Sequence, residues 1–225
     1  MAFTPWLRVL RTSLERRSAL HERCKHRPRA RRSRPRLETL EDRTVLSTVT
    51  WTGTAGDNNW DTGGNWSTGS ALTSADAVQI NSGTVNLNHA ATVSNLTLSG
   101  GTLVDSAAMT VSGLFSWTGG TLQGVNGQGS LTAAGGSTIS GSLVTLDDGF
   151  TFINPAGQTV TWGSAGGNSV IQSPHPATFD NAGTLLLQGN TSMENSSTFN
   201  NSGIALQSSG GSSGFFDQDV NNSGT

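Results

Sequence analysis

Few side chains in this 225-residue chain could carry chemistry, and they are dispersed. Adjacent carboxylates occur at Asp147 and Asp148, followed by Gly149. A carboxylate pair can serve acid–base catalysis when the two groups converge on one substrate. Successive side chains of a strand point to opposite faces, and glycine is typical of turns. The sequence Asp-Asp-Gly therefore predicts a turn without catalytic function.

Histidine offers little more. His89 and His175 are the only histidines after residue 47, and His175 lies between Pro174 and Pro176. Neither has an acid or a nucleophile at a spacing that indicates a catalytic pair. We expect both to be surface residues, and the sequence predicts no catalytic residue, no cofactor and no enzymatic activity.

One segment partly matches a calcium-binding loop. Asp57, Asn59 and Asp61 alternate as the first oxygen ligands of such a loop do. The glycine required at the sixth position is Thr62, and the acid required at the twelfth is Thr68. A turn is predicted here, and no metal site.

Tryptophan is concentrated in one short segment: Trp51, Trp60 and Trp66 lie within 16 residues, among Gly, Asp, Asn and Thr. The favoured interpretation is an aromatic cap over an apolar end of the following structure. The alternative is a platform on which sugar rings stack. The segment from Trp51 to Trp66, followed by Ala75-Asp76, resembles the opening of autotransporter-like and planctomycete β-solenoid passengers, which favours the cap.

The charges divide the chain into two parts. All 13 Lys and Arg lie between Arg8 and Arg43 with five acidic residues, so residues 1–43 carry a net charge of +8. Residues 44–225 hold ten acidic residues and no Lys or Arg. The body therefore cannot neutralise nucleic-acid phosphates, and lysine or arginine chemistry is excluded from it. Cys24 lies in the basic part, so the body has no disulfide.

The basic tail, residues 1–47, combines a short leucine-containing helical pattern with an arginine- and proline-rich run that is too charged to pack. A nucleic-acid arm, an organellar presequence and a bacterial export leader are the alternatives. The sequence Leu37-Glu38-Thr39-Leu40-Glu41-Asp42-Arg43-Thr44-Val45-Leu46-Ser47 resembles the leader of giant surface and extracellular proteins of planctomycete bacteria. The resemblance implies export, to the cell surface or the medium. No stretch approaches the roughly 20 apolar residues of a membrane-spanning helix.

A repeat of about 20 residues follows. Glycines recur at spacings of 18, 19, 21, 22, 20, 20 and 21 residues, and all but the last are followed two positions later by an apolar residue: Gly83, Gly101, Gly120, Gly141, Gly163, Gly183, Gly203 and Gly224. Short alternating apolar pairs between them indicate strands with one buried face, and no helical period appears after Val45. These features predict an all-β fold, a right-handed parallel β-helix of about eight coils, over an immunoglobulin-like sandwich.

The clearest repeats predict a ladder. Asn181, Asn201 and Asn222 occupy equivalent positions, so their amides should stack from coil to coil, with Phe179 and Phe199 stacked inside. The sequence ends where each earlier unit begins a strand, which suggests either a longer protein or edge-to-edge self-association through the last coil.

We therefore expect three parts: a basic leader or disordered tail over 1–47, a Trp-rich cap over 48–81 and a solenoid over 82–225. The predicted function is that of a non-catalytic structural or adhesive segment of a secreted or cell-surface protein. Surface glycans or other cell-surface proteins are the expected partners. The alternative function is a glycan-binding or polysaccharide-processing β-helix module, which would use Trp51, Trp60 and Trp66 or a groove of the solenoid.

Overall fold

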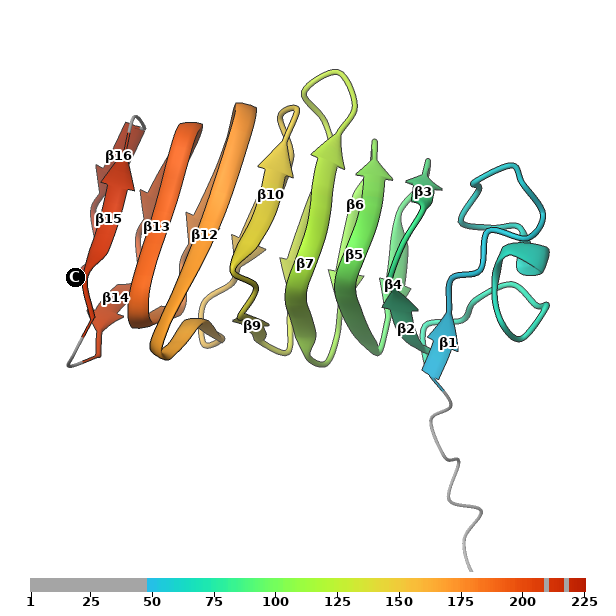
Figure 1. Ribbon diagram of the computed structural model, residues 1–225, viewed down its shortest axis with the longest axis horizontal. Helices are drawn as coiled ribbons and strands as arrows, with labels where there is room; N and C mark the ends of the chain where they lie inside the picture. The colour runs from blue at the N-terminus through green and yellow to red at the C-terminus, as the bar shows by residue number, and fades with distance from the viewer. Residues whose placement is uncertain (1–47, 209–210, 217–218) are drawn as a thin grey trace, which may run out of the picture. The chain divides into compact units, whose positions relative to one another are not determined.

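The computed structural model describes residues 48–208, 211–216 and 219–225, and they form the predicted parallel β-solenoid (Figure 1). Its strands pair in parallel along the whole stack, from β1 with β2 to β13 with β16. The basic tail, residues 1–47, lies outside the described residues.

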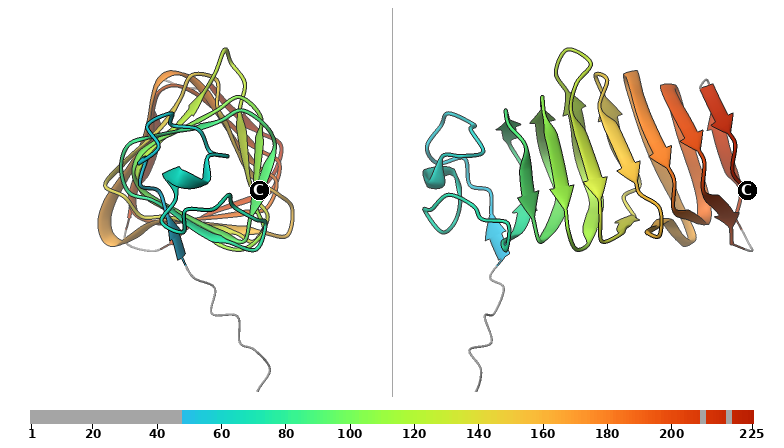
Figure 2. Two further views of the ribbon diagram at one scale, coloured as in Figure 1. Left: turned by 90° about the vertical axis from the view of Figure 1, so that its right-hand side faces the viewer. Right: turned by 180° about the vertical axis from the view of Figure 1, so that it is seen from behind.

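Three sheet faces surround the core, as the view along the axis shows (Figure 2). The first face contains β1 (Thr48–Thr50), β2 (Ala77–Ile80), β9 (Ser137–Ile139) and β14 (Ile204–Gln207). The second contains β3 (Thr84–Leu87), β10 (Leu143–Asp147) and β15 (Ser213–Phe216). The third contains β4 (Ala91–Val93), β6 (Ala108–Val111), β8 (Ser130–Ala133), β11 (Thr151–Asn154) and β16 (Asp219–Asn222).

Four long strands continue around the corners between faces. The strands β5 (Asn95–Asp105) and β7 (Phe115–Gly124) cover the first and second faces, and β12 (Thr159–Asn181) and β13 (Thr184–Asn201) cover all three. The first coil begins at β2, inside the predicted cap, and the described strands make seven coils, one fewer than the predicted eight.

The core consists of inward side chains that repeat from coil to coil. In β3 and β11, for example, every second residue is buried, as expected for strands with one face toward a core. On the third face Phe152 pairs with Phe179 and Phe179 with Phe199. Their rings make edge contacts with centroids 4.9 and 5.5 Å apart, an arrangement that favours aromatic pairs.

The predicted single column of glycines is wrong, because the glycines occupy two corners. Gly83 and Gly101 lie between the first and second faces with φ of 79° and 74°. Thr102 N–H donates to Gly83 O at 2.8 Å. Gly183 and Gly203 lie instead between the third and first faces, where Ile204 N–H donates to Gly183 O at 2.9 Å. Both corners favour glycine, because a Cβ on Gly101, Gly183 or Gly203 would collide with the backbone of the preceding coil.

Coil length also varies more than the glycine spacing indicates. Val160 pairs with Leu185, 25 positions later, whereas Phe179 pairs with Phe199, 20 positions later. The extra residues lie at corners, where the register between β12 and β13 shifts. The predicted period therefore describes the last coils and fails in the middle of the stack.

Residues 51–76 cover the N-terminal end of the core, with one short 3₁₀ helix, η1 (Gly63–Asn65). The buried Asn65 organises this cap. Its side-chain oxygen accepts from Ala55 N–H at 2.9 Å, and its amide donates to Asp57 Oδ1 at 2.6 Å. These bonds satisfy a polar group that is fully buried in the cap.

Candidate functional site

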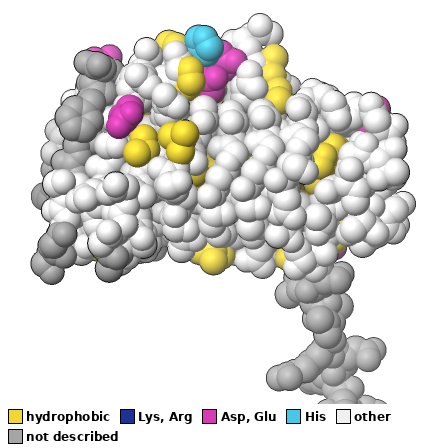
Figure 3. All heavy atoms as spheres, viewed as in Figure 1, with side chains coloured by type: hydrophobic (Ala, Val, Ile, Leu, Met, Phe, Trp, Pro, Cys, Tyr) yellow, Lys and Arg dark blue, Asp and Glu magenta, His cyan; other side chains and the backbone are white. Residues whose placement is uncertain are grey.

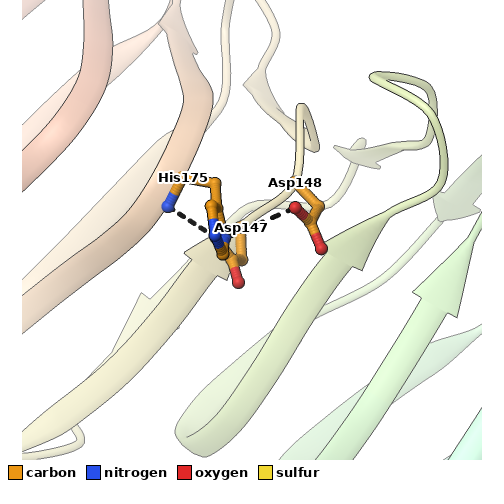
Figure 4. A group of neighbouring side chains, drawn as sticks. All are labelled: Asp147, Asp148 and His175. Carbon is orange, nitrogen blue, oxygen red and sulfur yellow. Dashed lines mark hydrogen bonds and ion pairs between the residues drawn. The ribbon is translucent and has the colours of Figure 1, made fainter.

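Three titratable side chains converge where the second face meets the third. Asp147, Asp148 and His175, here called the Asp-Asp-His cluster, each offer a ligand atom within 4.8 Å of the others (Figure 4). His175 Nδ1 lies 3.0 Å from Asp147 Oδ1 and 3.4 Å from Asp148 Oδ1. The two carboxylates therefore face one imidazole nitrogen.

The turn after β10 brings the two carboxylates to the same side. Asp147 ends the strand, and Asp148 and Gly149 then take positive φ values of 53° and 77°. The left-handed conformation breaks the alternation that would send adjacent strand side chains to opposite faces. Phe150 is fully buried directly after the turn, and its N–H donates to Asp147 O at 3.1 Å. The predicted turn is confirmed, but the expectation that the carboxylates diverge is wrong.

His175 comes from the next coil, in the Pro-His-Pro segment of β12. Its backbone N–H donates to Asp147 Oδ1 at 2.8 Å, and its ring nitrogen lies 3.0 Å from the same oxygen. The side chain of His175 is 64% exposed and that of Asp147 only 14%. The prediction of a surface histidine is confirmed, but the prediction that it has no partner acid is wrong.

A shallow groove lies beside the cluster. It has a volume of about 590 Å³ and is lined by Asp148 and His175 together with Gln123 and the 125–127 loop. Gln123 Nε2 donates to Asp148 Oδ2 at 2.6 Å. Val104 of β5 lines it too, so the groove joins residues of four successive coils, those that contain β5, β7, β10 and β12.

No cation of the body balances these acids, since residues 44–225 contain no Lys or Arg. The face drawn in Figure 3 shows a histidine against acidic side chains at its upper edge. Asp147 Oδ1 accepts one bond from the His175 backbone N–H and lies 3.0 Å from the ring Nδ1, and Asp148 Oδ2 accepts one bond from Gln123. The arrangement can hold a cation between its oxygens and the ring nitrogen, and it orients the ring firmly.

His89 forms a second, simpler pair. Its Nδ1 lies 3.2 Å from Asp61 Oδ2, and both side chains are about half exposed. The pair joins the cap to the loop after β3. His89 thus also has a partner acid that its spacing in the sequence did not indicate. Among the described residues one carboxylate, that of Asp61, lies at ion-pair distance from its ring, and Asp105 interacts with it more weakly.

The partial calcium-loop pattern forms a hydrogen-bonded turn, as predicted. Asp57 accepts from the Thr62 hydroxyl at 2.6 Å, from Asn59 N–H at 3.0 Å and from the Asn65 amide. These bonds, the Thr62 bond first, hold the pKa of Asp57 below its usual value. Asp61 points instead to His89, so the alternating side chains do not converge on one point.

The proposed sugar platform on the tryptophans is wrong. Trp51, Trp60 and Trp66 are only 6%, 3% and 2% exposed and belong to the core. Trp66 makes edge contacts with the other two rings at 4.9 and 5.0 Å. Its Nε1 donates to Trp60 O at 2.7 Å. Buried rings cannot present their faces to a sugar, so these residues are a cap, the favoured interpretation of the sequence.

The asparagine ladder is present and is longer than predicted. Asn181 donates to Asn201 at 2.6 Å, and Asn201 donates to Asn222 at 2.8 Å. Asn154 of β11 adds a further step by donating to Asn181 at 2.6 Å. The ladder was predicted only over the last three repeats because the longer coil between Asn154 and Asn181 hides their equivalence in the sequence.

Asp105 is a buried ionisable residue that the sequence did not single out. It ends β5 with its side chain fully buried. Oδ1 accepts from Ala107 N–H at 2.6 Å, and Oδ2 has no hydrogen-bond partner. Desolvation raises the pKa of Asp105 to about 6, against smaller lowering effects of the Ala107 bond and of His89. The signal in the sequence was its inward position in the Leu-Val-Asp alternation, two residues after Leu103.

The fold and the Asp-Asp-His cluster define a parallel β-solenoid with a polar site on one corner. Comparison of the chain with protein-family models, with curated proteins and with solved structures finds no match. Within the described part of the chain, none of the helical structure has the length and apolar character needed to cross a membrane.

Proposed function

We propose that residues 48–225 are a non-catalytic structural or adhesive segment of a secreted or cell-surface protein. The observation that carries the proposal is the continuity of the stack. Parallel pairing links successive coils from β1 to β16, and four asparagines add side-chain bonds inside the last four coils. A stack of this kind is a stiff spacer, because each coil is held by both neighbours.

Repeated polar groups on the outside support adhesion. On the third face Asp180, Asn200 and Asn221 form an outer column, with side-chain bonds of 2.7 and 2.8 Å. Beside it Thr151, Thr178 and Thr198 pair in register. A repeating surface can bind a repeating partner at many points and gain avidity without strong single contacts. Surface glycans or other cell-surface proteins are the proposed partners.

The location can be tested through the leader that the sequence resembles. The full chain would be expressed in a planctomycete host, and intact cells probed with an antibody against residues 48–225. We expect surface or medium signal, and its loss when Glu38, Glu41 and Arg43 are replaced by alanine. Retention of the unaltered chain in the cytoplasm would contradict the proposal.

Adhesion can be separated from enzymatic activity with the purified full chain. We expect retention on cells or on a glycan array without release of new reducing ends from the bound polysaccharides. Trp60→Ala serves as a folding control. The buried ring cannot contact a glycan directly, so any loss of binding in this variant reports a change in folding. Turnover of a polysaccharide would overturn the non-catalytic proposal in favour of a processing module.

A further inference from the structure

We propose that the Asp-Asp-His cluster is a binding site for a divalent cation of the zinc type, which joins neighbouring coils. This inference is independent of the proposed function. The donor set is mixed, with one imidazole nitrogen and two carboxylates. Imidazole and carboxylate are both ordinary ligands of Zn²⁺, whereas Ca²⁺ and Mg²⁺ bind almost entirely through oxygen.

The two distances from the imidazole nitrogen to the carboxylates match those between neighbouring ligands on one metal ion. With metal–ligand bonds of about 2.1 Å, neighbouring ligand atoms are about 3.0 Å apart in an octahedron and about 3.4 Å apart in a tetrahedron. His175 Nδ1 lies 3.0 and 3.4 Å from the two carboxylate oxygens. A cation could therefore bind with small movements of side chains that are already in place.

Contacts from the coils on either side hold the ligands in this arrangement. Asp147 is fixed by the N–H of His175, and Asp148 by the amide of Gln123. The turn between the carboxylates is constrained as well, because a Cβ on Gly149 would lie 2.3 Å from Gly127 Cα. Such support orients metal ligands and strengthens binding. The groove beside the cluster leaves room for water to complete the coordination.

The charge of the body favours a cation from solution. Residues 44–225 have no Lys or Arg, so the body offers no permanently positive side chain to pair with Asp147 and Asp148. On binding, the cation would take the lone pair of His175 Nδ1, with the ring proton on the other nitrogen. It would then connect the coil of β10 to the coil of β12 and resist their separation.

The test is a calorimetric titration of the full chain with ZnCl₂ near neutral pH, together with thermal unfolding. The N-terminal segment contains His21, Cys24 and His26, so the result is the difference between the unaltered chain and His175→Ala. We expect this variant to bind one equivalent less. It should also lose the part of the Zn²⁺-dependent rise in Tm that comes from this site, because ligands that bind the folded state raise Tm.

His89→Ala is the matched control, because His89 faces one carboxylate instead of two. We expect it to keep the full stoichiometry. Asp148→Asn keeps the shape of the turn and should weaken binding at this site by about tenfold or more. Equal stoichiometry and affinity in the unaltered chain and in His175→Ala would overturn the proposal. So would tight binding of Ca²⁺ at the cluster that does not require His175.

Discussion

The first and the last described coils of the solenoid differ in their interiors. At the N-terminal end, three tryptophans pack against one another and are almost fully buried. At the C-terminal end, Val220 continues the column of Phe179 and Phe199 but is 48% exposed. An amide ladder is added there, since Asn181, Asn201 and Asn222 bond from coil to coil. The comparison teaches that apolar burial stabilises both regions, and that the last coils add side-chain hydrogen bonds to it.

The largest effect is expected from removing a ring of the cap. Trp66→Ala should lower the free energy of unfolding by about 3–5 kcal/mol, because it leaves a cavity between two other rings. Chemical denaturation followed by circular dichroism would measure the loss. Leu114→Ala is the control, since Leu114 is 46% exposed and should cost less than about 1 kcal/mol. Equal losses would mean that the cap does not stabilise the coils.

Asp105 separates the first coils from the last in a second way. At the corner between the second and third faces, the Asp105 carboxylate has an Oδ2 without a hydrogen-bond partner, whereas at the corner between the third and first faces the asparagines of the last coils bond to one another. Its folded-state pKa, about 6, is raised from 3.8. Its unfavourable contribution is therefore absent below about pH 4, grows as pH rises toward 6, and is complete above that.

Asp105→Asn should therefore stabilise the protein at pH 7 by up to about 3 kcal/mol, the equivalent of roughly two pKa units. The amide should also remove the loss of stability between about pH 4 and 6. Unfolding curves across this pH range would show both effects. Asp219→Asn, at an exposed position, provides the comparison and should change neither. An unchanged pH profile in Asp105→Asn would show that the carboxylate is not desolvated as described.

How much of the fold and of the candidate site could be predicted from the sequence depends on the length of each coil. Alternating apolar residues and a period near 20 were enough for the class of fold and for the ladder of Asn181, Asn201 and Asn222. The middle coils have longer corners, and Val144 pairs with Ile171, 27 positions later. That length places His175 over Asp147, a contact that a period of 20 hides. The spacing of the glycines did not reveal that these coils are longer, because glycines occur at two different corners.

The ladder itself provides a comparison within the last coils. Asn181 accepts from Asn154 and donates to Asn201, so Asn181→Ala removes one ladder bond from each of two buried amides. This should cost about 2–3 kcal/mol. Asn222 is exposed and bonds only to Asn201 within the ladder, and Asn222→Ala should cost about 1 kcal/mol or less. Thermal unfolding of both variants would give the ratio, and similar shifts in Tm would contradict a ladder that is most important inside the stack.

The smallest effect is expected at the exposed end of the aromatic column. Val160 is fully buried and Val220 is 48% exposed, so the same substitution tests burial alone. Val160→Ala should lower the free energy of unfolding by about 1.5–3 kcal/mol. Val220→Ala should lower it by less than about 1 kcal/mol, because the Val220 side chain has less apolar surface buried from water. Denaturant unfolding of the two variants measures the difference. If Val220→Ala cost as much as Val160→Ala, the valine would be covered in solution, and the concentration dependence of Tm would then show whether a second copy of the chain covers it.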